Sequence, residues 1–144
     1  MTPDHGLRAL AYVEAVWADD PDAMRALARS ERGQPGIEQL VSQLSQDTIR
    51  LTTLAQAGWT EGMDPAAEAA IGEQLRADGA ARMAHLLSDT LELWAQHARP
   101  DAAPGLARVL IGYLMTLSPA VTEQDVPQLL EQLRSGLIHR AAAD

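Results

Sequence analysis

The chain has 144 residues, the size of one domain, and a chain of this length buries roughly 68–70% of its unfolded surface on folding, so a core needs no cross-links. It contains no Cys, which excludes disulfides and thiolate metal sites. Twenty acidic residues face eleven basic ones, and the net charge of −9 disfavours binding to phosphate backbones, so we expect no nucleic acid on this chain alone. Good helix formers dominate and there is no Phe, which predicts an all-α domain.

The amino terminus shows no basic region followed by an apolar run, so no secretory signal is predicted. No apolar run approaches the roughly 20 residues that cross a bilayer. We therefore expect a cytoplasmic protein that does not enter a membrane.

Apolar side chains at three- and four-residue steps predict a first helix that ends near Ala18. Asp20-Pro21 then signals a helix start, because Asp accepts hydrogen bonds from first-turn amides and Pro is tolerated at the first helical position. A short second helix, a loop over residues 30–36 and a long third helix over residues 37–57 follow.

The Asp-Pro start signal recurs at Asp64-Pro65, after a loop over residues 59–63. Helical spacing continues to residue 98, with a candidate break at Asp78-Gly79. The pattern leaves open whether residues 65–98 form one kinked helix or two.

Two closing helices carry the clearest apolar stripes of the chain. Asp101 is expected to cap the first of them, Ser118-Pro119 to end it, and Asp125 to cap the second. Gly112 lies inside the first, where it costs about 1 kcal/mol relative to Ala, so we expect another helix to approach it closely.

Motifs that carry chemistry are missing from the sequence. His85 and Asp89 lie four residues apart on one helix face, but two ligands do not make a metal site, and an exposed pair is the simpler interpretation. Neither a Gly-x-Ser-x-Gly turn nor a phosphate-binding loop occurs. We predict no catalytic residue, no metal site and no cofactor.

Large flat or flexible side chains suit a cavity for an apolar small molecule, although they suit an ordinary core as well. The candidate ligand-binding residues are Trp59, Met83, Trp94, Tyr113 and Met115.

The last third of the chain contains the segments ARPDAAPGLARVLIGYL, residues 98–114, and TEQDVPQLLEQLRSGL, residues 122–137. Together, over about residues 98–140, they resemble the last two helices of the effector-binding carboxy-terminal domain of TetR-type transcriptional regulators. The amino-terminal DNA-binding helices of that family have no counterpart here. The resemblance implies an apolar effector pocket and a two-fold bundle of the last two helices. Carried over, the dimer face is Leu106, Val109, Tyr113, Leu130, Leu133 and Leu137.

We therefore predict one all-helical domain over residues 1–144, a bundle of six or seven helices that forms a homodimer. The expected function is a non-enzymatic, regulator-like binding domain that holds an apolar small molecule or a partner protein. One alternative is an acidic inhibitor or immunity-type protein that covers a basic partner, with its charge accelerating encounter. Another is a helical enzyme without a recognisable motif.

Overall fold

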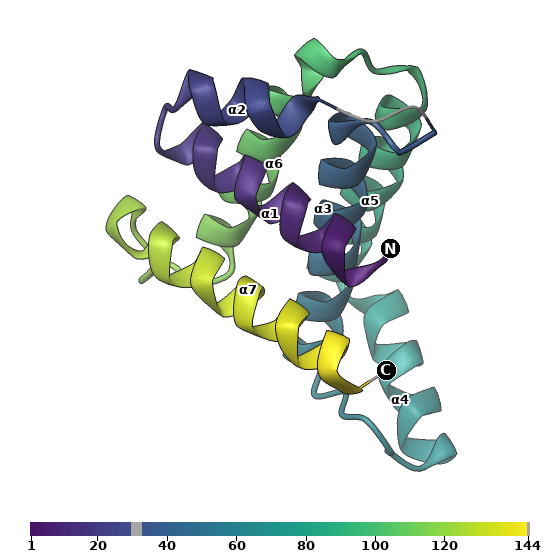
Figure 1. Ribbon diagram of the computed structural model, residues 1–144. Coiled ribbons are helices and arrows are strands. Elements are labelled where there is room, and N and C mark those ends of the chain that lie inside the picture. The colour runs from purple at the N-terminus through teal and green to yellow at the C-terminus, as the bar shows by residue number, and fades with distance from the viewer. Residues whose placement is uncertain (30–32, 144) are drawn as a thin grey trace.

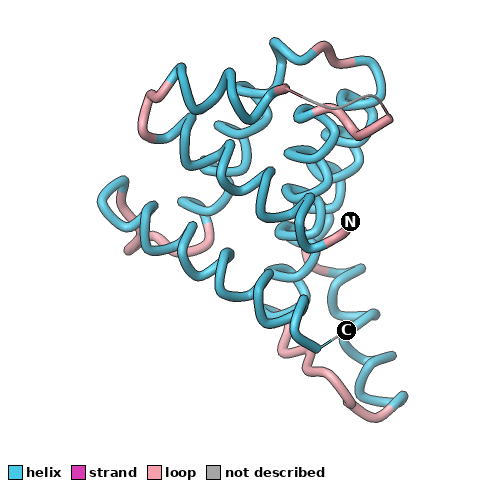
Figure 2. Tube along the Cα trace, in the orientation of Figure 1, coloured by secondary structure: helices cyan, strands magenta, loops and turns pink. Residues whose placement is uncertain are grey.

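The computed structural model describes residues 1–29 and 33–143, and the predicted loop over residues 30–36 lies partly outside them. All regular secondary structure of the described residues is helical, and Figure 2 shows loops between the helices and at the amino terminus. Its elements are α1 (Pro3–Trp17), α2 (Pro21–Ala28), α3 (Ile37–Gln56), α4 (Pro65–Ala77), α5 (Gly79–His97), η1 (Pro100–Ala102), α6 (Ala103–Thr116), η2 (Glu123–Asp125) and α7 (Val126–Ala143). The prediction of an all-α fold is confirmed, and no described helix is both long and apolar enough to cross a membrane.

The two Asp-Pro signals start helices as predicted. Asp20 Oδ1 accepts hydrogen bonds from the backbone N–H groups of residues 22 and 23 at 3.1 and 2.9 Å. Asp64 Oδ1 does the same for residues 66 and 67 at 2.9 and 3.1 Å. Each carboxylate thereby satisfies two amides that the first helical turn leaves unpaired.

Residues 65–98 form two helices. Asp78 leaves the helical conformation with φ −75° and ψ 125°, and its Oδ1 accepts a hydrogen bond from Ala81 N at 2.9 Å. The same residue therefore ends α4 and caps α5. The chain changes direction there, and α4 projects from the bundle at the foot of α5 (Figure 1).

The predicted caps of the closing helices are wrong. Asp101 lies inside η1, and α6 begins without a side-chain cap. Asp125 occupies the third position of η2, where its Oδ2 accepts hydrogen bonds from Thr122 N at 2.7 Å and from Thr122 Oγ1 at 2.8 Å. Thr122 and Asp125 form a capping box, so the Thr is the cap and the Asp is its partner three residues later.

The core lies where α1 and α3 meet the helices around them. Helix α1 packs against α2, α3, α6 and α7, and α3 also packs against α5 and α6 (Figure 1). Polar contacts reinforce this packing: Ser42 Oγ on α3 donates to Leu91 O on α5 at 3.0 Å, and Arg134 on α7 forms an ion pair with Glu14 on α1.

The apolar stripes of α6 and α7 are covered within one chain. Leu106 is fully buried, Leu130 is 2% exposed and Leu137 is 8% exposed. Val109, Tyr113 and Leu133 are half-buried and pack against the same core. Leu106, Leu130 and Leu137 therefore have little exposed surface left for a second copy, because α6 packs on α1 and α3, and α7 packs on α1.

Candidate functional site

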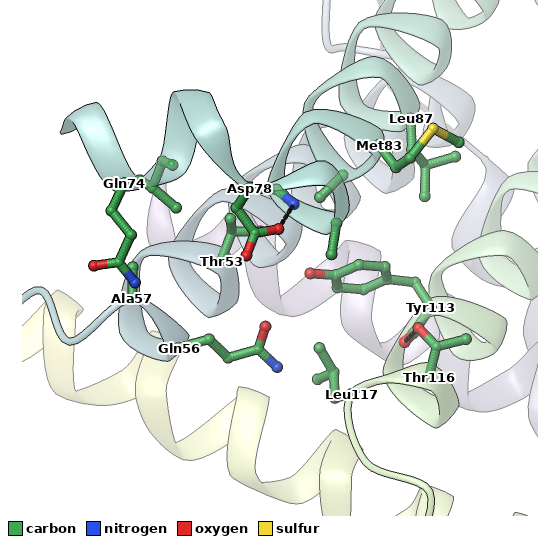
Figure 3. Close-up of a pocket in the computed structure, with 14 residues that line it drawn as sticks. Thr53, Gln56, Ala57, Gln74, Asp78, Met83, Leu87, Tyr113, Thr116 and Leu117 are labelled. Carbon is green, nitrogen blue, oxygen red and sulfur yellow. Dashed lines mark hydrogen bonds between the residues drawn. The ribbon is translucent and has the colours of Figure 1, made fainter. Parts of the chain in front are cut away.

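A cleft of about 540 Å³ opens between α3, α4, α5 and α6, and we take it as the candidate ligand-binding site (Figure 3). Four helices contribute to it because α5 and α6 both pack on α3, while α4 turns back beside α5 at Asp78. The lining residues are Thr53, Gln56, Ala57, Gln74, Leu75, Asp78, Ala80, Ala81, Met83, Ala84, Leu87, Tyr113, Thr116 and Leu117.

The Tyr113 ring extends across the cleft between the side chains of α5 and the end of α3 (Figure 3). Its hydroxyl oxygen lies 2.8 Å from Thr52 Oγ1, and the hydroxyl lies 3.4 Å from Ile49 O. These contacts hold the phenol against α3, so that the face of the ring is offered to the cleft. An apolar or aromatic ligand could pack on such a face.

Most hydroxyl groups of the cleft are already committed to the backbone. Thr53 Oγ1 donates to Ile49 O at 2.7 Å, and Thr116 Oγ1 donates to Tyr113 O at 2.7 Å. One carboxylate oxygen of Asp78 accepts from the α5 backbone. The Gln56 amide points into the cleft in Figure 3, and no described residue hydrogen-bonds to it, so it is the group best placed to orient a ligand.

Two of the five predicted ligand-binding residues, Met83 and Tyr113, line this cleft. Trp59, Trp94 and Met115 do not line it. Trp59 lies in the loop between α3 and α4. Trp94 lies near the carboxyl end of α5, where its Cη2 is 3.7 Å from the position that a Cβ on Gly105 would occupy. The structure therefore places two of the five predicted residues at this cleft and the other three outside it.

Sequence reasoning missed the polar residues of the cleft. Thr53 and Gln56 come from the last turn of α3 and Ala57 is its C-cap residue, while Gln74 lies near the end of α4 and Asp78 is its C-cap residue. They line one cleft because the chain reverses direction between α4 and α5. No sequence pattern near these residues predicts that tertiary arrangement. The one available clue was Asp78, which sequence analysis named as a break.

A second cleft, of about 610 Å³, lies on the other side of the α4–α5 corner. Its floor includes the buried Ile49, and its rim carries Arg50, Arg82 and the His85–Asp89 pair, whose Nε2 and Oδ2 atoms are 3.7 Å apart. The pair lies on one helix face as predicted, and both side chains are exposed. Within residues 1–29 and 33–143, no three His, Asp or Glu side chains lie close enough to hold a metal ion.

Gly112 does not make the close helix contact that was predicted. It is exposed, and apart from its two chain neighbours and the nearby backbone of its own helix, no described atom lies within 4 Å of the position of an added Cβ. The neighbouring Gly105 is the residue of α6 that a side chain approaches, namely that of Trp94.

Comparison with known proteins finds no matching family model, no matching curated protein and no matching solved structure. The resemblance to TetR-type regulators thus rests on residues 98–140 alone.

Proposed function

We propose that the protein is a non-enzymatic binding domain that holds an apolar small molecule in the cleft between α3, α4, α5 and α6. The observation that carries this proposal is the cleft of about 540 Å³ with walls formed largely by apolar side chains. Small-molecule sites typically have volumes of roughly 300–1,000 Å³, apolar walls and a few polar groups that orient the ligand. The cleft has each of these properties.

The ligand would pack on Leu87, Leu117 and the ring of Tyr113, with Met83 adapting at the rim. Met suits that position because its unbranched, polarisable side chain adjusts to ligands of different shape. The Gln56 amide, which can both donate and accept, would bind one polar group of the ligand.

Helix α4 supplies the wall that could respond to a ligand. None of its residues is buried, and it projects from the bundle (Figure 1). A ligand that touches Gln74 and Leu75 would therefore add contacts that α4 otherwise lacks. This coupling supports a regulator-like role, in which occupancy of the cleft changes the position of a helix.

The proposal can be tested with N-phenyl-1-naphthylamine, an uncharged apolar probe whose fluorescence rises on transfer from water. We expect it to bind the wild-type protein, and Ala57→Trp to weaken binding by roughly tenfold or more, because the indole would fill the cleft. Ala55→Trp is the matched control, since Ala55 is exposed on the same helix and outside the cleft. Equal binding by both variants, or no binding by the wild type, would refute the proposal.

We also propose that the domain acts as a homodimer, as the resemblance implies. The leucines of α6 and α7 at positions 106, 130 and 137 are buried in one chain, so pairing needs another surface. The largest group of exposed apolar side chains is on α5.

A further inference from the structure

Arginine side chains from three helices line the second cleft, of about 610 Å³, beside the α4–α5 corner. They are Arg50 on α3, Arg76 on α4 and Arg82 on α5. Bases are scarce in this chain, in which twenty acidic residues face eleven basic ones. Among the described residues that line the cleft, however, the three arginines outnumber the two carboxylates, those of Asp47 and Asp89. The charge balance of the cleft is therefore the reverse of that of the whole chain.

Two of these arginines have no partner among the described residues. Arg50 and Arg82 form no hydrogen bond or ion pair with any of them. Arg76 pairs with Glu73 on its own helix, but these side chains are 70% and 78% exposed, so water weakens the pair. A guanidinium carries five N–H donors in a fixed fork that matches the oxygens of an acidic group. The donors of Arg50 and Arg82 are thus available to an anion.

The two aspartates of the cleft do not neutralise these arginines. Neither forms an ion pair with an arginine in the described part of the chain. Asp89 lies beside His85 instead, with 3.7 Å between its Oδ2 and the imidazole Nε2. Asp47 also lines a smaller cleft beside the amino terminus, so it lies at the boundary between the two clefts. Positive charge therefore remains in the second cleft.

Apolar surface lies in the same cleft. Ile49 is 1% exposed and lines it from α3. Leu54 on α3 and Leu75 on α4 are half-buried and line it as well. Small-molecule sites typically combine such apolar walls with a few polar groups that orient the ligand, in a volume of roughly 300–1,000 Å³. A bare inorganic anion would leave the apolar walls uncovered, so a ligand that fits the cleft needs an apolar body.

From this combination we infer that the second cleft binds a small organic acid in its ionised form. The acidic group would lie on Arg50 and Arg82, and the apolar body would pack on Ile49, Leu54 and Leu75. The first cleft is unsuited to such a ligand, because no arginine is among its described lining residues. The inference goes beyond the proposed function and does not depend on it, since the two clefts would hold ligands of different charge.

A pair of fluorescent probes isolates the effect of the negative charge. The dye 8-anilinonaphthalene-1-sulfonate is N-phenyl-1-naphthylamine, the uncharged probe of the first cleft, with one sulfonate added. Arg50→Gln and Arg82→Gln should each weaken binding of the sulfonate by roughly three- to tenfold, a modest loss because both arginines are exposed to water. Both variants should bind the uncharged probe as the wild type does. Arg108→Gln is the matched control, because it removes the same charge from an exposed position on α6 outside both clefts.

Filling the second cleft tests its location without a change of charge. Ser88 on α5 lines the second cleft and not the first. We expect Ser88→Trp to weaken binding of the sulfonate by roughly tenfold or more, because the indole would occupy the ligand's volume. Thr90→Trp is the control, since Thr90 is exposed on the same helix and outside both clefts. Circular dichroism checks that each variant is folded, and the exposed arginine variants test the site even if Ser88→Trp does not fold.

Competition identifies the class of ligand. In the Ala57→Trp variant, whose first cleft is filled, decanoate should displace the sulfonate probe. Acetate and inorganic phosphate at the same concentration should not displace it, because they lack an apolar body. Equal displacement by phosphate and decanoate would overturn the assignment to an organic acid.

The remaining outcomes separate this inference from the proposed function. Equal binding of the sulfonate by wild type, Arg50→Gln and Arg82→Gln, or no binding by the wild type, would overturn the anion site. Loss of both probes in Ala57→Trp would show that the sulfonate binds in the first cleft, which would overturn the inference and leave the proposed function intact. Failure of the uncharged probe to bind, with the arginine effects on the sulfonate as expected, would overturn the proposed function alone.

Discussion

Replacing Leu130 by Ala should destabilise the single chain, whatever its state of association. Leu130 lies on α7, is 2% exposed and belongs to the core that α1, α3, α6 and α7 share. A buried Leu→Ala substitution costs about 2–5 kcal/mol, the larger values applying where the surroundings cannot collapse into the cavity. Helix α7 packs chiefly on α1 and can move slightly toward it, so we expect about 3 kcal/mol.

That loss is readily measured. For a chain of this size each kcal/mol lowers the melting temperature by about 2–4 °C, so Leu130→Ala should lower it by about 6–12 °C. Urea unfolding monitored by circular dichroism should show a lower midpoint with an unchanged slope, since the surface exposed on unfolding is nearly the same. Ile138→Ala on the same helix is the control and should cost about 1 kcal/mol or less, because half of that side chain is already in water.

The concentration dependence separates this prediction from the interface that the sequence suggested. If Leu130 stabilises the core of one chain, the difference between wild type and variant should be the same at low and high micromolar concentration. If Leu130 packed across a dimer axis, the variant dimer would dissociate, and the difference in stability between variant and wild type would depend on protein concentration. The second result would refute the assignment of Leu130 to the core of one chain.

Three further predictions concern single residues. Burial of the Tyr12 phenol, and then the negative charge of Glu38, raise the pKa of Tyr12 above 10.0, so its stabilising effect is present below pH 10 and is lost as pH rises through the raised value. The free energy of unfolding of Tyr12→Phe, measured by urea titration at a series of alkaline pH values, should therefore fall less steeply with pH than that of the wild type. Hydrogen bonds from the backbone N–H and hydroxyl of Thr122 lower the pKa of Asp125, so this carboxylate stabilises the fold above its unfolded pKa, and the benefit disappears as pH falls through the lowered value. In Asp125→Asn, the melting temperature should therefore fall less than in the wild type as pH is lowered from neutral to acidic values. The same pH profile in variant and wild type would contradict the capping role. Gly112→Ala should stabilise the protein by about 1 kcal/mol in urea unfolding, because Ala favours helix and no other described helix comes within 4 Å of the new methyl group. Destabilisation would instead indicate that a helix of another chain packs there.

Local features of the chain were predictable from sequence because their causes are local. Asp20 and Asp64 cap helices through hydrogen bonds to residues two and three positions ahead, and any Asp-Pro start can form those bonds. Where the structure differed, as at Asp125, the residue predicted to be the cap is its partner in a capping box, and Thr122, which was not predicted, is the cap.

The candidate site was only partly predictable. Met83 and Tyr113 were chosen for their size and flexibility, and both line the cleft. Trp94 was chosen for the same reason and lies elsewhere on α5, over Gly105. Side-chain type indicates what could line a cavity, but the path of α4 decides where the cavity is.

By itself, the sequence determined that the chain is helical, where most helices begin, and which face of each is apolar, because these follow from hydrogen bonds and spacings within a few residues. Only the tertiary structure decided which helix covers which face. Helices α5, α6 and α7 all carry apolar stripes, yet Leu106 on α6 and Leu130 on α7 are buried by the helices packed around them, whereas Leu86 and Leu93 on α5 are exposed. The physical reason is that burial of an apolar stripe is favourable against any apolar surface, so the stripe does not select its partner. Which helix covers it depends on how all seven α-helices of the described chain pack together.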